Sequence, residues 1–412
     1  MLIEIHAIQN HSPANLNRDD LGAPKTCYFG GVMRSRISSQ CIKRSIRTSD
    51  QFKLLCGGIR TRRLPQYLAD QIKDKEMLPL AQAVVRACGL IKEDEAKGGK
   101  KDVIVFLSKS ATARMADLLR AEPVEVTEKQ VAKLARGFAQ LVAEDRFAPD
   151  MALSGRMLEP AKPKKTKKGQ NADVPEQDDD QGENDSKDKG VWKGLDLGIE
   201  AALQVAHAIS THEARPEVDY FVAADDVPGA DAGGAHIGEA MFASACFYKY
   251  FSIHWETLVE NLKGNKELAA HTIGAFLRGA ALANPSGKQN SFAAHNRPDG
   301  IVVEVKKDRC TPISYANAFA SPVPMKGPRD IVPQSIAQLG QYIHDLDTGY
   351  GKAHEDKRFW FSPNLRYPLS YQEDNKEHPC ADQNLKSLDD LVKLVVEAIG
   401  FDWEKVQTVT VK

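Results

Sequence analysis

The sequence predicts a mixed α+β fold, and three observations support that prediction. The run from Leu2 to Ile8 alternates polar and apolar residues as a β-strand does. Several longer stretches have the apolar spacing of amphipathic helices. Strands and helices follow one another without a regular βαβ repeat, which favours α+β over a doubly wound parallel sheet.

Composition is typical of a globular chain with two or three domains. The chain has 412 residues, of which 42% are hydrophobic and 27% are charged. Its 55 Lys and Arg nearly balance 56 Asp and Glu, which excludes a uniformly basic nucleic-acid binder. Seven cysteines without a Cys-x-x-Cys pair disfavour a disulfide framework and a zinc site. With no membrane-length apolar run and no signal-peptide pattern, we expect a cytoplasmic protein.

The N-terminal half is predicted to contain a strand, a loop and a group of helices. Turn-forming residues between Asn10 and Pro24 indicate a long loop after the first strand. A second, buried strand is expected at 103–107. Thr127 and Gln130 have the spacing of a capping box, which marks a helix start. The expected helices are Pro79–Ile91, Thr112–Ala121 and Thr127–Glu144.

Residues 161–190 differ from the rest of the chain. Five lysines lie between Lys162 and Lys168, an acidic run follows, and Leu, Ile, Met and aromatic residues are absent. Such a stretch cannot bury enough apolar surface to offset the entropy of ordering, so we expect a disordered charged insertion. The lysine run could contact nucleic acid, but a solvated linker is the favoured interpretation.

The C-terminal half is predicted to alternate helices with an extended hairpin. The hairpin is expected from two β-like runs, Tyr220–Ala224 and Phe242–Ile253, with turn-forming residues between them. A further strand is expected at Ile301–Val305. The expected helices are Leu195–Thr211, Lys266–Asn284, Ser335–Asp347 and Ser387–Ile399.

The strongest local signal is a basic, acid-free stretch from Leu21 to Ser49. Ser38 or Ser39 can cap a helix in which Ile42 and Ile46 share one face. The opposite face is polar and cationic, and no local acid neutralises it, so it fits a polyanion. The ordinary alternative is that this face is a solvated surface. Gly30 and Gly31 permit a partner to approach the backbone closely, which makes that alternative less favoured. The polar face contains Gln40, Lys43, Arg44 and Arg47.

Sequence blocks along most of the chain resemble the CasC family, the guide-binding backbone subunit of the type I-E CRISPR surveillance complex, Cascade. The blocks keep their order from the N-terminus almost to residue 351. They include His11-Ser12-Pro13, Leu16 to Asp20, Phe29-Gly30-Gly31, Arg36 to Gln40, Ala152 to Met157, Ala206 to Ile209, Phe221 to Asp226, Ala235 to Gly238, Ala316 to Phe319 and Gly349-Tyr350-Gly351.

The resemblance implies an RRM-like (ferredoxin-like) palm, helical fingers and an extended thumb arm. About six copies would polymerise on a CRISPR guide RNA and present it in segments to a target DNA strand. Further implied partners are the large, small, guide 5′-end-binding and guide-processing subunits. The implied domains are residues 1–50 (first part of the palm, with the basic helix), 51–160 (fingers), 161–190 (insertion), 191–218 (palm helix), 219–240 (thumb) and 241–412 (remaining palm).

The resemblance also assigns roles to individual residues. Hydroxyl, amide and cationic groups would bind the guide backbone without reading sequence. Apolar side chains would act as a wedge that displaces one base at each interval, although the residues alone fit an ordinary core. The expected guide-binding set is Arg18, Lys25, Ser38, Gln40, Lys43, Arg44, Arg47 and Arg156. The expected wedge is Met157, Phe221 and Val222.

No catalytic residue, metal site or cofactor is expected. The chain has no phosphate-binding Gly-rich motif, and the five-residue spacing of His207 and His212 is a poor metal pair on a helix. The alternative is a metal-dependent ribonuclease, in which Asp19 and Asp20 would recruit Mg²⁺ and cut target RNA. An ordinary ion pair with Arg18 is the favoured interpretation of these acids.

Overall fold

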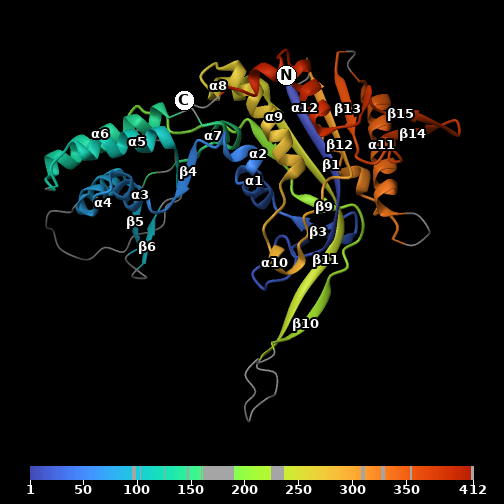
Figure 1. Ribbon diagram of the computed structural model, residues 1–412, viewed down its shortest axis with the longest axis horizontal. Coiled ribbons are helices and arrows are strands. Elements are labelled where there is room, and N and C mark those ends of the chain that lie inside the picture. Colours follow the sequence, from blue (N-terminus) through green and yellow to red (C-terminus); the bar gives the residue numbers. More distant parts are fainter. Residues whose placement is uncertain are drawn as a thin grey trace, which may run out of the picture. The chain divides into compact units, whose positions relative to one another are not determined.

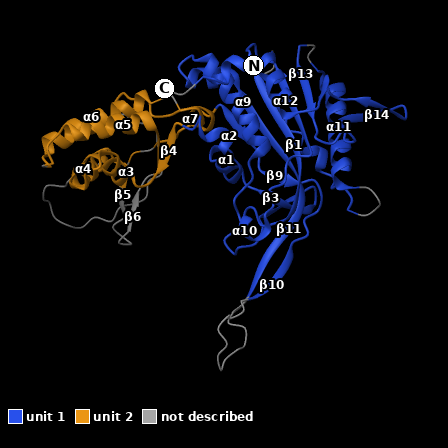
Figure 2. Cartoon of the chain, viewed as in Figure 1, with its two compact units in different colours: residues 1–56, 202–412 blue, residues 57–201 orange. Residues whose placement is uncertain are grey.

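The structure, a computed structural model, divides the chain into two compact units, residues 1–56 with 202–412 and residues 57–201 (Figures 1 and 2). It confirms the mixed α+β class, whereas the RRM-like palm stays a prediction. No helix of the described residues is long and apolar enough to cross a membrane. The structure describes residues 1–94, 99–102, 104–124, 126–145, 148–158, 160, 190–223, 236–307, 311–325, 330–352 and 355–409.

A ten-stranded mixed sheet forms the framework of the first unit. Strand β1 (Leu2–Ala14) is predicted correctly at its start but continues through five residues of the expected loop. It pairs antiparallel with β11 (His236–His254) and β12 (Gly300–Lys306). The sheet order is β16-β13-β12-β1-β11-β9-β3-β2, and β8 and β10 also pair with β11. The remaining strands are β2 (Thr26–Phe29), β3 (Val32–Ile37), β8 (Leu203–Val205), β9 (Ala208–Ser210), β10 (Glu217–Ala223), β13 (Lys357–Phe361) and β16 (Gln383–Leu385).

Alternation along β1 and β11 gives the sheet two faces, and helices cover both. On one face Tyr248 packs in a cluster with Ile336 and Leu339 of α11 (Ile331–Tyr350), so we call it the α11 face. On the other, Phe251 contacts Phe276 of α9 (Lys266–Leu282), which makes it the α9 face. The first unit also contains α1 (Ser39–Arg47), α2 (Asp50–Lys53), α8 (Trp255–Asn261), α10 (Gln289–Phe292), η3 (Ala316–Phe319), α12 (Leu388–Ala398), α13 (Trp403–Val406) and the hairpin β14 (Ser370–Glu373)–β15 (Lys376–Pro379).

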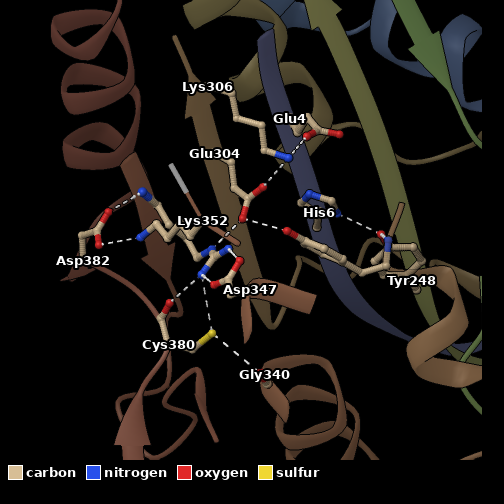
Figure 3. Close-up of polar contacts among 12 residues, drawn as sticks. Glu4, His6, Tyr248, Glu304, Lys306, Gly340, Asp347, Lys352, Cys380 and Asp382 are labelled. Atoms are coloured by element: carbon tan, nitrogen blue, oxygen red, sulfur yellow. Dashed lines mark hydrogen bonds and ion pairs between the residues drawn. The ribbon is translucent and has the colours of Figure 1, made fainter. Parts of the chain in front are cut away.

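Buried charges form a continuous network on the α11 face (Figure 3). Lys306 lies between two carboxylates, Glu4 and Glu304, with its Nζ 3.1 Å from Glu304 Oε2. Arg358 bridges Glu304, at 2.5 Å, and Asp347, at 2.6 Å. Glu4 and Glu304 are buried. The polar positions that predict β1 therefore do not mark a solvent-exposed face.

The second unit is mainly helical and has its own core. Strands β4 (Gly58–Thr61) and β7 (Val105–Ser108) pair antiparallel, and all four residues of β7 are buried, as the apolar run predicts. The capping box at Thr127 is present and begins α6 (Glu128–Glu144). The other elements are α3 (Leu64–Ile72), η1 (Lys75–Met77), α4 (Leu78–Ala87), β5 (Ile91–Asp94), β6 (Gly99–Asp102), α5 (Lys109–Arg120), α7 (Pro149–Ser154) and η2 (Gly190–Trp192).

The predicted helix over Leu195–Thr211, and with it the palm helix at 191–218, is wrong. This segment contains β8 and β9, which pair with β11, and residues up to Ala201 belong to the second unit. Its Ala and Leu favour a helix locally, but long-range strand pairing overrides that preference. The expected insertion lies outside the described residues except at Gly190, as do Asp225 and Asp226.

The predicted extended hairpin is confirmed in its two strands. Strand β10 runs antiparallel to β11, from the pair Glu217 and Phe242 to the pair Ala223 and His236. The two strands extend as a ribbon beyond the rest of the sheet (Figure 1). Residues 224–235, which join them, lie outside the described residues. The function of this hairpin as a thumb stays a prediction.

Candidate nucleic-acid interface

The basic helix α1 forms as its local sequence predicts. Ser38 is its N-cap, and the Ser38 hydroxyl accepts a hydrogen bond from the backbone N–H of Cys41. Ile42 and Ile46 are buried, and a Cβ built on Gly279 of α9 would lie 2.9 Å from Ile46 Cγ2. Arg44 and Arg47 occupy the last turn, where cations interact favourably with the helix dipole. The helix is therefore fixed through its apolar face.

The polar face of α1 collects four of the predicted guide-binding residues. Gln40 and Arg44 are exposed, and Lys43 and Arg47 are half-buried. Ser38 belongs to the same element but is buried, because its hydroxyl caps the helix. A phosphate backbone on this face would meet cations and an amide, the groups that contact phosphate without reading bases.

A second basic group lies around Arg36, and sequence reasoning missed part of it. Arg36 Nη1 donates a hydrogen bond to Nδ1 of exposed His207 over 2.8 Å. Burial, Arg36 and Lys25 together lower the pKa of His207, which favours a neutral ring. The sequence pattern presents His207 only as part of a poor metal pair on a helix. Its position near two cations, a long-range property, marks it as an interface candidate.

A pocket of ≈ 560 Å³ lies between the loop after β1 and helix α1. Its lining combines two predicted cations, Arg18 and Arg44, with both acids, Asp19 and Asp20. Asp19 Oδ1 accepts hydrogen bonds from the N–H groups of Leu21 and Ala23, so this carboxylate shapes the loop. Within the described ranges, no group of three or more His, Cys, Asp or Glu side chains comes together as metal ligands would.

Two arginines, one from the sequence blocks and one from the acid-free stretch, are core residues. Arg156, predicted to bind the guide, is buried in the second unit, where Nη2 donates to Val142 O and Nε to Leu197 O. Arg34 of the acid-free stretch is fully buried and donates to the carbonyls of Ser210 and Phe319, among others. Carbonyls hold both guanidinium groups in the core, and Arg156 Nη1 also lies 3.7 Å from Oδ2 of buried Asp145, so the burial of Arg156 does not fit the predicted guide contact.

The glycine pair has a packing function that differs from the expected one. Gly30 and Gly31 form the turn between β2 and β3 with φ of 61° and 80°. A Cβ at Gly30 would lie 1.7 Å from Ala320 O, whereas one at Gly31 would meet nothing within 4 Å. Gly30 therefore allows the hairpin to pack against the chain itself.

The three predicted wedge residues are exposed. Met157, in the second unit, has 85% of its surface exposed. Phe221 and Val222, on β10, have 46% and 60% exposed, and Val218 and Tyr220 of the same strand are exposed as well. The Phe221 ring lies over its cross-strand partner Gly238, where a Cβ would come within 2.5 Å of it. Exposure contradicts the ordinary-core interpretation for Met157 and Phe221.

Two chains of solved structures are similar to this chain. A chain of a solved structure titled "CRISPR RNA-guided surveillance complex, pre-nicking" is similar, with a TM-score of 0.75 and 26% identity. The match covers 97% of this chain and 100% of that one. A second chain, from "CRISPR RNA-guided surveillance complex", has a TM-score of 0.56 and 24% identity over 97% of this chain and 100% of that chain, and shows the fold alone.

Comparison with curated proteins gives no match. The family model described as CT1975-like protein matches residues 3–169 and 191–393, and the break between the two ranges, residues 170–190, lies within the expected insertion. The matched ranges span most of the chain and include the basic helix, the pocket-lining loop and the hairpin. The protein therefore belongs to the CT1975-like protein family.

Proposed function

We propose that the chain is an RNA-binding scaffold subunit of a Cascade-type CRISPR surveillance complex. The observation that carries the proposal is the similarity over 97% of the chain to a subunit of such a complex. The exposed cationic face of α1 supplies the chemistry that a scaffold on a guide RNA needs. In complexes of this kind, base pairing reads the target while the protein holds the guide through its backbone.

The proposed guide contacts are the groups that the structure places at the surface of the first unit. Cations on α1 and on the loop after β1 would neutralise phosphates, and the amide of Gln40 would donate to them. Ser38 contributes indirectly, by fixing the start of α1. Arg36 and His207 are added to the predicted set, and Arg156 is removed. The resulting set is Arg18, Lys25, Arg36, Gln40, Lys43, Arg44, Arg47 and His207.

The finer parts of the proposal rest on the CasC resemblance. Exposed Met157, Phe221 and Val222 would displace a guide base, since apolar side chains replace stacking without selecting a base. About six copies would assemble on one guide and present it in segments to a target DNA strand, in a type I-E complex with the other Cascade subunits. The scaffold would act without catalysis of its own.

The RNA-contact proposal is tested by the salt dependence of binding. Lys43→Ala and Arg47→Ala should each weaken binding of a labelled oligouridine and lower the log-log salt slope by about 0.7, because each removes one phosphate contact. Lys405→Ala, an equal charge change at a side chain 83% exposed on α13, should leave the slope unchanged. Equal slopes for all three variants and the unmodified protein would refute the contact set.

The rival function, metal-dependent ribonuclease activity, is kept because Asp19 and Asp20 line the pocket beside Arg44. Incubating the assembled complex with complementary RNA and Mg²⁺ distinguishes the two functions. Intact RNA supports the scaffold. Evenly spaced cuts that Asp19→Ala or Asp20→Ala abolishes would replace it with the nuclease.

A further inference from the structure

A buried lysine lies beneath the proposed guide-binding surface. Lys249 of β11 has only 3% of its surface exposed, and its position opposite Ala7 of β1 places it on the α9 face. Its Nζ donates a hydrogen bond to Gln9 Oε1 over 2.5 Å. Within the described part of the chain, Lys249 forms no ion pair with a carboxylate. The ammonium group is thus held in the sheet by a neutral partner.

Hydrogen bonds connect this lysine to the floor of the 560 Å³ pocket. Gln9, which accepts from Lys249, donates through Nε2 to Asn284 Oδ1 over 3.0 Å. Asn284 lines the pocket together with Cys41 and Arg44 of α1. Lys249 also interacts electrostatically with Cys41. Gln9 and the lining residue Asn284 therefore link the buried ammonium to the pocket beside the basic helix.

An isolated buried cation is unfavourable unless another charge compensates it. Burial lowers the pKa of Lys249 to about 8 from its ordinary 10.5, so the amine still carries its proton at neutral pH. An anion in or above the pocket would stabilise that charge, and a guide phosphate is such an anion. Uncompensated charge that a fold retains next to a binding surface is a recurrent sign of function.

We propose that Lys249 is a positioning cation that attracts a guide phosphate through the pocket floor and so strengthens RNA binding from inside the fold. The inference rests on the proposed guide-binding function and deepens it. Lys249 would touch no nucleotide. It would act by its field across α1 and Asn284, where low-dielectric protein screens charge less than water does.

The groups around Lys249 determine how this contribution varies with pH. Burial lowers the pKa of His11 on β1 to about 3, so that ring stays neutral. Burial raises the pKa of the Cys41 thiol on α1, which keeps it protonated through the neutral range. Gln9 and Asn284 are neutral. The pocket adds two cations and two acids, Arg18, Arg44, Asp19 and Asp20, on its outer lining.

The expected change in RNA affinity follows from the distance between Lys249 and a bound phosphate. A helix is about 10 Å across, so a phosphate on the outer side of α1 lies on the order of 10 Å from a group beneath it. At an effective dielectric of about 20, that attraction corresponds to roughly tenfold in affinity. RNA would in turn raise the pKa of Lys249, so its contribution should disappear as the pH rises toward about 10.

The test compares oligouridine affinity of the full-length protein and Lys249→Met between about pH 7 and about pH 10 at fixed salt. We expect the variant to bind roughly tenfold more weakly at about pH 7 and about equally at about pH 10. Lys249→Arg, which stays charged throughout, should keep its affinity over the whole range. Pairing each protein with Cys41→Ser excludes thiol titration as the cause.

The outcomes distinguish a failure of the role of Lys249 from a failure of the proposed RNA-binding function. Equal affinity of Lys249→Met and the unmodified protein at about pH 7, or a deficit that does not change with pH, would overturn the role of Lys249 while leaving RNA binding intact. If the unmodified protein binds no oligouridine at any pH, the proposed function fails first. The Lys249→Met comparison decides the matter even if the larger arginine prevents folding.

Discussion

The two faces of one sheet bury charge in opposite ways. On the α11 face, Lys306 and Arg358 alternate with Glu4, Glu304 and Asp347, so each cation lies between two carboxylates (Figure 3). On the α9 face, Lys249 has a neutral amide as its hydrogen-bond partner. The charges of the α11 face are therefore compensated within the fold. In our proposal, the charge of Lys249 is compensated only by a bound anion.

The pKa shifts of Glu304, Arg358 and Lys249 reflect the different surroundings of these buried charges. Burial alone would raise the pKa of Glu304, but Arg358 and Lys306 hold it well below its usual range. Burial would lower the pKa of Arg358, yet Glu304 and Asp347 raise it well above its ordinary value. At Lys249 burial dominates, and the pKa falls. The ion pairs thus favour the charged forms of Glu304 and Arg358, although burial raises the pKa of Glu4 in the same network. At Lys249 burial opposes the charged form.

Removing one member of the α11 network should have the largest effect on stability. Arg358→Met would leave Glu304 and Asp347 without their shared cation, which typically costs about 3–5 kcal/mol for a buried pair. Chemical denaturation at neutral pH measures the change in the free energy of unfolding. Exposed Lys357→Met, on the same strand, should change it by less than about 0.5 kcal/mol. A similarly small change for Arg358→Met would mean that the network is not a structural unit.

Removing the buried cation Lys249 should have the opposite effect on the free energy of unfolding. Unfolded Lys249 keeps its proton up to pH 10.5, whereas the folded form releases it near 8, so the charged lysine destabilises the fold at neutral pH. Lys249→Met should raise the free energy of unfolding by up to about 3 kcal/mol at pH 7, less the cost of leaving Gln9 Oε1 without its donor.

That gain should shrink as the pH rises through the interval between the two pKa values, because the unmodified protein becomes more stable there. Denaturation curves at several pH values measure it. A Lys249→Met variant that is less stable at neutral pH, by an amount independent of pH, would show that Lys249 is an ordinary structural residue. The stability gain and the RNA-binding loss together would mark a site that sacrifices stability for function.

Local sequence predicts those features of the fold and of the site that depend on interactions between neighbouring residues. The cap at Ser38, the buried pair Ile42 and Ile46, and the capping box at Thr127 depend on residues three or four positions apart, and all three are present. The strands of the hairpin follow from their own alternation and turn-forming residues. Such features need no knowledge of the rest of the chain.

Long-range contacts decide the rest. Arg34 and Arg44 lie in the same basic stretch, yet one donates to carbonyls from distant segments and the other lines a pocket. Strands β8 and β9 form because β11 offers them partners, against their Ala and Leu content. Lys249 stands in an apolar run, where sequence gives no sign that its amine connects to the pocket. Each of these results depends on contacts between segments that lie far apart in the sequence, which no local pattern encodes.

The smallest expected difference at neutral pH is between variants of the two buried histidines, one on each face. Burial lowers the pKa of both His6 and His11 to about 3. The unfolded rings bind protons near pH 6.5, whereas the folded rings do so only near pH 3. As the pH is lowered between these values, each ring should therefore lower the free energy of unfolding by about 1.4 kcal/mol per pH unit. His11→Phe and His6→Phe should each remove one such slope, measured by denaturation across this range.

At neutral pH the two variants should differ. The ring of His6 is hydrogen-bonded to the Tyr248 hydroxyl through Nδ1, at 2.8 Å, whereas neither ring nitrogen of His11 has a hydrogen-bond partner among the described residues. His6→Phe should therefore cost about 1 kcal/mol, and His11→Phe should be neutral or slightly stabilising. The reverse order would mean that the hydrogen bond between His6 and Tyr248 does not decide the cost of losing the His6 ring, whose Nε2 also lacks a hydrogen-bond partner among the described residues.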